Sequence, residues 1–551
     1  MKSELTQPRL LRGLGIGTKR VCGKIRFFRH EESLPRPTRA PLSPDLEWTR
    51  LNTSLAQTSE QISRLYDRAL RSIGESEAQI FEIHGMLIED EDFRDALHAE
   101  IRNGHPAEEA LRLAAQHIAE MFESLNDPYL SARAADIKDV ASQVMRFLTG
   151  ANAGKTAPDS SPFILVADDL TPSETVLLEK SQILGFVTFR GTPNSHTAIL
   201  ARAMGIPALV SVGVIDAVYD GTLALLDASD ATLTLSPTEE QQSVFAEKLR
   251  IDDRIAREHD RYLRSLMNKP AVTRGGHRML IYANIGDGDE VEAALSNGAD
   301  GIGLLRSEFL YLGCQDYPSE EALFESYKDI AIRMQGKRTI IRTLDIGADK
   351  KIAYFGLPEE ENPALGFRAI RICLARKDLF KTQLRAILRA SAFGRLSLML
   401  PMIISPDEVR QSKQLLRECM DELRRENLRF DSEIELGVMI ETPASVMMSE
   451  ELATEVDFFS VGTNDLTQYT LAADRQNPAL SKLCEENREP ILRMIELAAK
   501  AIHHAGGWIG ICGEMAADLH LTQRWADLAI DELSVSVPYL LGLRGKVTEC
   551  R

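Results

Sequence analysis

The sequence predicts a multidomain α/β protein in which a small α/β domain, interrupted by a helical bundle, precedes a C-terminal (β/α)8 barrel. Two patterns carry this prediction. Apolar residues recur at helical spacing from Trp48 to about Leu148, and strand-like runs alternate with helical stretches from about Arg278 to the C-terminus. The chain has 551 residues, which is too long for one ordinary core.

The helical bundle is predicted within residues 29–148. Its first helix has one apolar seam, formed by Trp48, Leu51, Leu55, Ile62, Leu65 and Ala69. Further helical stretches cover residues 80–88, 110–122 and 137–148, and turn-like segments at 104–106 and 126–128 separate them.

The small α/β domain is predicted from residues 1–28 and 149–236. Short β-rich runs occur at 163–167, 185–189, 207–212 and 222–227, and residues 13–28 are strand-like as well. The bundle is therefore expected to be an insertion after the first strand of this domain. A charged stretch opened by Pro237 then predicts a helical linker over 237–267.

The barrel is predicted over residues 268–551. The strand candidates are MLIYAN, GIGLLRSE, TIIRTLD, LSLMLPM, LGVMIET, FFSVGTND, WIGICGE and LSVSVP, which are enough for a (β/α)8 barrel. Polar side chains follow these runs: Asn284, Arg306, Glu308, Arg342, Asp345, Glu441, Asn464, Asp465, Cys512 and Glu514. Because the carboxyl ends of barrel strands meet at one mouth, we expect these residues to form an active site.

Composition narrows the functional class. The net charge of −18 argues against general nucleic-acid binding and suits a basic protein partner. No apolar run is long enough to cross a bilayer, and residues 1–17 lack the apolar core of a signal peptide, so we expect a cytoplasmic protein without membrane insertion. The 7 cysteines show no C-x-x-C pair, which predicts free thiols, with neither disulfides nor a zinc site.

The sharpest short motif is GTPNSHTAILARAMGIPALV, residues 191–210. Its pattern predicts a helix that begins near His196 and stops at Gly205 and Pro207. A helix N-terminus favours a bound phosphate dianion, and the hydroxyls of Ser195 and Thr197 can add donors. Taken alone, such a histidine is more often a capping-turn residue without chemistry.

This motif closely resembles the phosphohistidine segment shared by Enzyme I, pyruvate phosphate dikinase and phosphoenolpyruvate synthase. The resemblance to the Enzyme I family extends over essentially the whole chain, including ILVADDLTPSET at 164–175 and AQIFEIHGMLIEDED at 78–92. It implies that His196 is phosphorylated, in a swivelling phosphohistidine α/β domain. One departure is Pro193, where family members often read G-G-x-T-S-H.

The resemblance also assigns the barrel residues. It implies that Arg306, Arg342, Asn464 and Arg475 hold phosphoenolpyruvate, with Lys350 and Arg368 assisting at the phosphate. Arginine forks suit a substrate with a phosphate and a carboxylate. Glu441 and Asp465 are hard oxygen ligands that suit Mg2+, and Cys512 would be the acid that protonates the enolate carbon. Each of these residues also has a simpler interpretation when it is taken alone. An arginine can be a surface residue, a carboxylate can be buried for structural reasons, and a cysteine can be a core residue.

The expected activity is transfer of the phosphoryl group of phosphoenolpyruvate to His196 and then to a histidine of the carrier protein HPr, which would bind the helical bundle. By resemblance we also expect a homodimer through the barrel, and the lack of an N-terminal sensor domain favours sugar transport. The alternatives are a nucleotide-dependent synthase or dikinase relative, which needs an ATP-binding domain, and a catalytically silent regulatory homologue.

Overall fold

The structure is a computed structural model that describes residues 7–28, 42–72, 75–124, 128–150, 161–168, 170–171, 173–174, 178, 180–192, 195–312, 314–350, 352–475, 477 and 480–551. The chain divides into two compact units, residues 1–255 and 256–551. The division falls inside the predicted linker.

The first unit contains a mixed β-sheet in the order β1-β8-β7-β3-β4-β5-β6-β2. Strands β3 to β6 run parallel, and the remaining pairings are antiparallel. The strands are β1 (Arg9–Arg12), β2 (Leu14–Ile16), β3 (Arg20–Phe27), β4 (Phe163–Ala167), β5 (Ile183–Thr188), β6 (Ala208–Val210), β7 (Leu223–Asp227) and β8 (Thr232–Leu235). Helix α7 (His196–Met204) connects β5 to β6, as a parallel pair requires.

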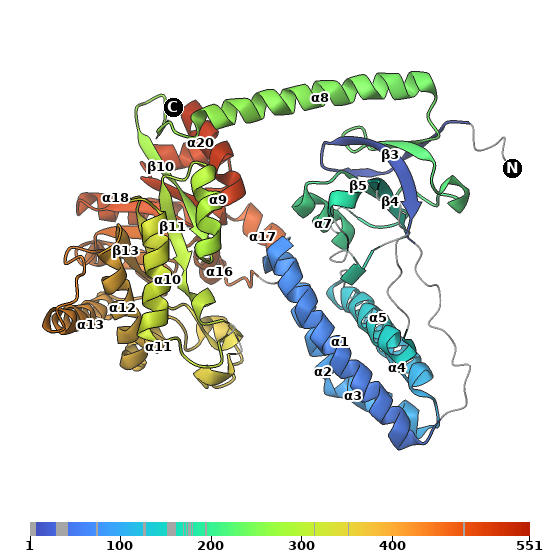
Figure 1. Ribbon diagram of the computed structural model, residues 1–551, viewed down its shortest axis with the longest axis horizontal. Coiled ribbons are helices and arrows are strands. Elements are labelled where there is room, and N and C mark those ends of the chain that lie inside the picture. The colour runs from blue at the N-terminus through green and yellow to red at the C-terminus, as the bar shows by residue number, and fades with distance from the viewer. Residues whose placement is uncertain are drawn as a thin grey trace. The chain divides into compact units, whose positions relative to one another are not determined.

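The helical bundle is inserted between the neighbouring strands β3 and β4 (Figure 1). Its helices are α1 (Pro44–Ser72), α2 (Glu75–Glu89), α3 (Glu91–Arg102), α4 (Ala107–Ser124) and α5 (Pro128–Thr149). The predicted seam of α1 faces the bundle core, where Leu51, Leu55 and Leu65 are buried. The bundle is joined to the α/β domain by Gln143, whose Nε2 donates to Ser173 Oγ over 2.7 Å.

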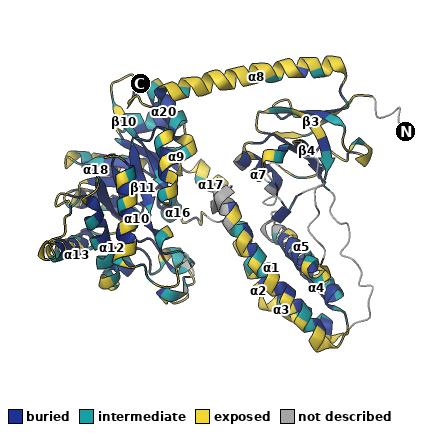
Figure 2. Ribbon diagram, in the orientation of Figure 1, coloured by how far each residue is buried: buried dark blue, intermediate teal, exposed yellow. Residues whose placement is uncertain are grey.

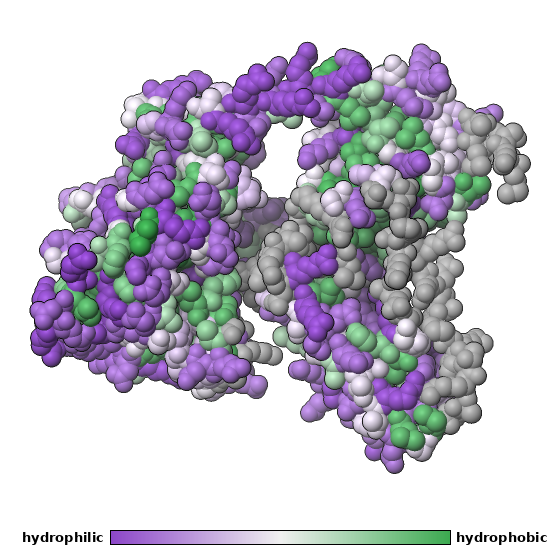
Figure 3. Space-filling view, in the orientation of Figure 1, coloured by the Kyte–Doolittle hydropathy of each residue, from purple (hydrophilic) through white to green (hydrophobic). Residues whose placement is uncertain are grey.

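Helix α8 (Glu239–Leu266) is the predicted linker, and its 28 residues are continuous. Most of its length is exposed (Figure 2) and hydrophilic (Figure 3). A helix of this length spans about 40 Å at 1.5 Å per residue. One continuous helix therefore links the two units along the chain.

The second unit is a closed barrel. Within its described residues, eight parallel strands follow one another in chain order, and β10 pairs with both β11 and β17 to close the ring. They are β10 (Arg278–Ile285), β11 (Gly301–Arg306), β12 (Thr339–Arg342), β13 (Leu396–Leu400), β14 (Glu435–Ile440), β15 (Phe458–Val461), β16 (Trp508–Ile511) and β17 (Glu532–Ser536). A short strand, β9 (Ala271–Val272), pairs antiparallel with β10. The predicted fold class is confirmed, and each strand candidate of the barrel became a strand.

The barrel helices form an outer layer around the strands (Figure 1). They are α9 (Val291–Ser296), α10 (Glu320–Arg333), α11 (Ile370–Ala375), α12 (Lys377–Ser391), α13 (Pro406–Arg425), α14 (Pro443–Met447), α15 (Ser449–Ala453), α16 (Thr463–Leu471), α17 (Ser481–Glu486), α18 (Glu489–His504), α19 (Thr522–Asp527) and α20 (Leu540–Glu549). The main core lies between strands and helices, and a smaller apolar cluster that includes Tyr282, Met439 and Phe458 fills the barrel interior.

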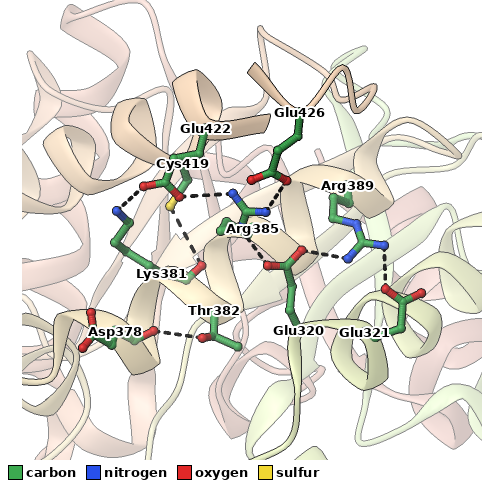
Figure 4. Close-up of polar contacts among 10 residues, drawn as sticks. All are labelled: Glu320, Glu321, Asp378, Lys381, Thr382, Arg385, Arg389, Cys419, Glu422 and Glu426. Carbon is green, nitrogen blue, oxygen red and sulfur yellow. Dashed lines mark hydrogen bonds and ion pairs between the residues drawn. The ribbon is translucent and has the colours of Figure 1, made fainter. Parts of the chain in front are cut away.

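A charge network links α10, α12 and α13 on the outside of the barrel (Figure 4). Arg385 contacts Glu320 at 2.6 Å, Glu422 at 3.1 Å and Glu426 at 2.7 Å. Its side chain is only 14% exposed, so these pairs are less screened than ordinary surface pairs.

Among the helices that the structure describes, none is long and apolar enough to span a membrane.

Candidate active site

The site is built at the carboxyl ends of the barrel strands. The strand ends carry Asn284 on β10, Arg306 on β11 and Arg342 on β12, while Glu441, Cys512 and their neighbours follow β14 to β16 directly. Side chains that are far apart in the sequence are thereby brought to one mouth, as the barrel rule requires.

Arg342 is a buried cation of the mouth, at 8% exposure. Its guanidinium is clamped by two carboxylates from different loops: Glu308 contacts Nη2, and Asp345 lies 2.8 Å from Nη1. Burial alone would lower the pKa of Arg342, but Asp345 and Glu308 outweigh it and hold that pKa above its ordinary value. The Nε donor of Arg342 is buried and has no hydrogen-bond partner within the described part of the chain.

Asp345 connects this clamp to a second arginine. Its Oδ1 accepts from Arg368 Nη2 over 3.0 Å, and Arg368 is 6% exposed. Burial would raise the pKa of Asp345, but Arg342 and Arg368, helped by Lys350, hold it well below its usual range. Asp345 is therefore a fixed anion that orients cations in this half of the mouth.

Glu441 and Asp465 form an acidic pair on the other side. Glu441 is fully buried, and its Oε1 accepts from the backbone N–H of Met402 over 2.6 Å. Burial, and then the like charges of Asp465 and Asp345, raise the pKa of Glu441 to about 8. The atoms Glu441 Oε2 and Asp465 Oδ1 are buried and have no hydrogen-bond partner among the described residues.

These two open oxygens suit a divalent cation. A cation would satisfy both acceptors and would remove the repulsion that raises the pKa of Glu441. In the described ranges there is no cluster of three or more histidine, cysteine or acidic side chains arranged for a metal. Two carboxylates are a donor set that fits Mg2+, which usually keeps water and substrate as its remaining ligands.

Asn464 and Arg475 flank the acidic pair. Asn464 exchanges hydrogen bonds with Glu514: its Oδ1 accepts from the Glu514 backbone N–H over 3.0 Å, and its Nδ2 donates to Glu514 Oε1 over 3.3 Å. Arg475 Nη1 lies 3.7 Å from Asp465 Oδ2, and the Arg475 side chain is 46% exposed. Arg475 is thus an exposed cation at the rim of the mouth.

Cys512 lies at the end of β16 and is 6% exposed. Its Sγ donates to the backbone oxygen of Val461 over 3.5 Å, and burial raises the pKa of its thiol to about 12. The thiol therefore keeps its proton at neutral pH. Asn284 holds this strand end, because its Nδ2 donates to the backbone oxygen of Cys512 over 3.0 Å.

A buried carboxyl lies below this layer. Glu532 on β17 is fully buried, and both its oxygens lack a partner among the residues described. A side chain at Gly510 or at Gly303 would collide with it, since a Cβ there would lie 1.8 Å or 2.4 Å from a Glu532 oxygen. Burial raises its pKa well above the ordinary value. Burial therefore favours the neutral form of this carboxyl inside the barrel.

His196 belongs to the first unit. It opens α7, as predicted, and Gly205 ends that helix in the left-handed conformation at φ 64°. Ser195 is the N-cap, and its Oγ is buried without a partner in the described part of the chain, whereas Thr197 is fully buried. The side chain of His196 and the whole of Pro193 lie outside the described residues.

Within the described part of residues 256–551, the structure thus brings together at one mouth all nine site residues that were expected in the barrel. They are Arg306, Arg342, Lys350, Arg368, Glu441, Asn464, Asp465, Arg475 and Cys512. Two strand-end residues to which the sequence assigned no role, Glu308 and Asp345, form the Arg342 clamp. The sequence reasoning missed Gln383 and Tyr469, which lie on outer helices and contact the loops of the mouth. Their only sequence signal is a polar residue on a largely apolar helix face.

Three family models match consecutive parts of the chain. The PEP-utilising enzyme N-terminal model matches residues 11–133, the mobile-domain model residues 160–231 and the PEP-binding-domain model residues 260–551. The last match alone covers more than half of the chain.

Curated relatives match nearly the whole chain. The phosphoenolpyruvate-protein phosphotransferase of Priestia megaterium is 40% identical over 97% of this chain and 93% of its own length. That of Bacillus subtilis (strain 168) is 37% identical over 97% and 94%. An NMR solution structure of Enzyme I (nEIt) is 28% identical, and the match covers 44% of this chain and 99% of that one, with a TM-score of 0.38. The chain is therefore a transferase that belongs to the phosphoenolpyruvate-protein phosphotransferase family.

Proposed function

We propose that this protein transfers the phosphoryl group of phosphoenolpyruvate to His196 and then to a histidine of the carrier protein HPr, as the first step of sugar uptake. The observation that carries this proposal is the pattern of open atoms in the barrel mouth. A buried donor, Arg342 Nε, and two buried acceptors, Glu441 Oε2 and Asp465 Oδ1, share one site. An anionic substrate bound together with a cation would satisfy all three.

The cationic side chains would divide the substrate between them. Arg306, Arg342, Asn464 and Arg475 would bind phosphoenolpyruvate, and Lys350 and Arg368 would assist at the phosphate. Since Asp345 and Glu308 already fix Arg342, its remaining donor is held in place before the substrate arrives. Such positioning lowers the entropy cost of reaching the transition state.

Glu441 and Asp465 would hold Mg2+, which would supply neutralisation of charge on the substrate oxygens. The residues of this chain would do the rest. The neutral ring nitrogen of His196 would attack phosphorus in line, so that the P–O bond to the enol breaks as the N–P bond forms. Cys512 would then give its proton to the methylene carbon of the enolate, which yields pyruvate.

The α7 N-terminus would support the phosphorylated histidine. The first N–H groups of a nine-residue helix and the Ser195 hydroxyl are donors that favour a phosphate dianion. We propose that residues 1–28 and 149–236 form the mobile phosphohistidine domain, and that the bundle, 29–148, receives HPr. The net charge of −18 suits a basic carrier. We also propose a cytoplasmic homodimer through the barrel, 268–551, with 237–267 as the linker.

The test is incubation of the purified protein with 32P-labelled phosphoenolpyruvate and Mg2+, without nucleotide, followed by mapping of acid-labile, base-stable label. We expect label on His196 that HPr removes, and no label in His196→Ala. Label that appears only after ATP is added would indicate a nucleotide-dependent relative. No label under either condition would indicate a catalytically silent homologue.

A further inference from the structure

Gln383 is a buried glutamine on an outer barrel helix. It lies on α12 at 1% exposure, among apolar neighbours such as Phe380, Leu384 and Ile387. Burying an amide is unfavourable unless each of its polar groups finds a partner. The partners of Gln383 therefore explain why a glutamine stands at this position.

Three hydrogen bonds satisfy this amide. Its Oε1 accepts from the backbone N–H of Leu344 over 3.0 Å, and its Nε2 donates to Ser307 Oγ over 2.9 Å and to the Tyr327 hydroxyl over 3.1 Å. The Leu344 N–H fixes the orientation, because the opposite orientation would set two donors against each other.

Two of these partners belong to the loops of the barrel mouth. Ser307 stands between Arg306 and Glu308, and Leu344 directly precedes Asp345. Glu308 and Asp345 are the carboxylates that clamp Arg342. The side chain of Gln383, on an outer helix, therefore binds both of the loops that carry the carboxylates of the Arg342 clamp.

The position of this contact matters because the backbone ladder has ended there. The pairing of strands β11 and β12 ends at Arg306 and Arg342. Beyond that point, the amide of Gln383 bridges the two chain segments in place of a strand pair. The spacing between Glu308 and Asp345, and so the direction of the Arg342 guanidinium, depends on this bridge.

We propose that Gln383 is a positioning residue that sets the Arg342 clamp and thereby the affinity of the site for its phosphorylated, carboxylate-bearing substrate. The inference rests on the proposed function, since it assigns Arg342 to substrate binding. Gln383 touches no reacting atom and acts through Ser307 and Leu344.

The test is the phosphoenolpyruvate dependence of His196 labelling in Gln383→Met and Gln383→Glu. Methionine keeps the volume but cannot accept from Leu344 or bind Ser307, so we expect KM to rise about 10-fold or more, with kcat within about threefold. Glutamate can accept from the N–H and from both hydroxyls, so we expect KM closer to the wild-type value. This rescue separates positioning from simple packing.

Tyr327→Phe is the matched control, because it removes the bond from Gln383 to α10 and leaves both loop contacts in place. We expect its KM to stay within about twofold of the wild-type value. Ser307→Ala removes one loop contact and should raise KM by about threefold, which tests the inference if Gln383→Met does not fold.

An unchanged KM in Gln383→Met, or in Ser307→Ala where the first variant is unfolded, would overturn the inference. The inference would also be overturned if, in every variant, only kcat fell and its fall matched the loss of folded protein. The wild-type protein in the same assay separates this failure from that of the proposed function, since a wild type without phosphoenolpyruvate-dependent label would refute the proposed function itself.

Discussion

Cys512 keeps its proton because burial raises its pKa to about 12, and a general acid needs that proton. We expect Cys512→Ala to slow the formation of pyruvate from phosphoenolpyruvate by about 10²-fold to 10⁴-fold, the usual contribution of a general acid. The binding of phosphoenolpyruvate should change little, since the cations are untouched. Single-turnover pyruvate formation and equilibrium binding measure the two effects.

The control for this variant is Cys550→Ala, which removes another buried thiol, at the C-terminal end of the barrel unit. Its rate of pyruvate formation should equal that of the wild type. A Cys512→Ala protein that forms pyruvate at the wild-type rate would show that another group delivers the proton.

Glu532 carries a prediction about pH. Its folded pKa is raised, so its contribution to stability is fully present below the unfolded pKa of about 4.3 and is lost as pH rises toward the folded value. Glutamine at this position is neutral at every pH. We therefore expect the stability of Glu532→Gln relative to the wild type to rise with pH between pH 5 and pH 8.

Urea unfolding of both proteins across this pH range measures the gain, and Glu450→Gln, at an exposed position, should show no comparable trend. A difference between Glu532→Gln and the wild type that does not vary with pH would mean that Glu532 is ionised in the folded barrel.

Helix α16 is tied to the loop that precedes Arg368. The Tyr469 hydroxyl on α16 donates to the backbone oxygen of Ala364 over 2.6 Å. We expect Tyr469→Phe to raise KM for phosphoenolpyruvate by about 2-fold to 10-fold, the value of one hydrogen bond, with kcat little changed. Steady-state kinetics decide this, and Tyr354→Phe, which loses a 2.7 Å bond to the backbone oxygen of Tyr311, is the matched control. Equal shifts in both variants would contradict a specific role for the α16 contact.

The charge network of α10, α12 and α13 predicts a stability effect that depends on salt. Arg385→Met leaves three carboxylates near one another without their shared cation, and we expect it to cost about 1.5 to 3 kcal/mol in unfolding free energy. Arg424→Met removes an exposed pair with Asp421 and a cation–π contact with Phe430, and should cost less than about 1 kcal/mol. Urea titrations in low and high salt test this, and a loss at Arg385 no larger than that at Arg424 would show that the network adds nothing.

Helix α8 joins the barrel to the unit that carries His196. Proline inside a helix costs about 3 kcal/mol and kinks it. We expect Ile255→Pro, at an exposed site near the middle of α8, to slow His196 labelling while binding of phosphoenolpyruvate to the barrel stays unchanged. Ile255→Ala should behave as the wild type. Labelling of the proline variant at the wild-type rate would mean that the stiffness of α8 is not needed.

Local patterns predicted much of this fold. The boundaries of α8, the start of α7 at His196 and the strands of the barrel follow from periodicity and turn residues, which act over a few positions. Helix α3 was missed. Asp90 accepts from the Phe93 N–H over 2.9 Å and caps this helix within a short acidic stretch.

Long-range partners were beyond the sequence. Nothing local indicates that β1 pairs with β8, or that Gln383 would reach the backbone of Leu344. The charged residues of the mouth could be predicted because the barrel places strand ends together and because their motifs resemble a family. Their clamps and bridges depend on which loops meet in space, and that is decided by packing of the entire barrel.

The insertion of the bundle between two hydrogen-bonded neighbours, β3 and β4, has a consequence for how such proteins diversify. Because the chain leaves and re-enters the sheet at adjacent strands, the sheet closes in the same way whatever lies between them. A bundle with a different surface could be exchanged there without disturbing either the histidine helix or the barrel. If the bundle receives HPr as proposed, the choice of recipient and the chemistry of the donor can then evolve independently.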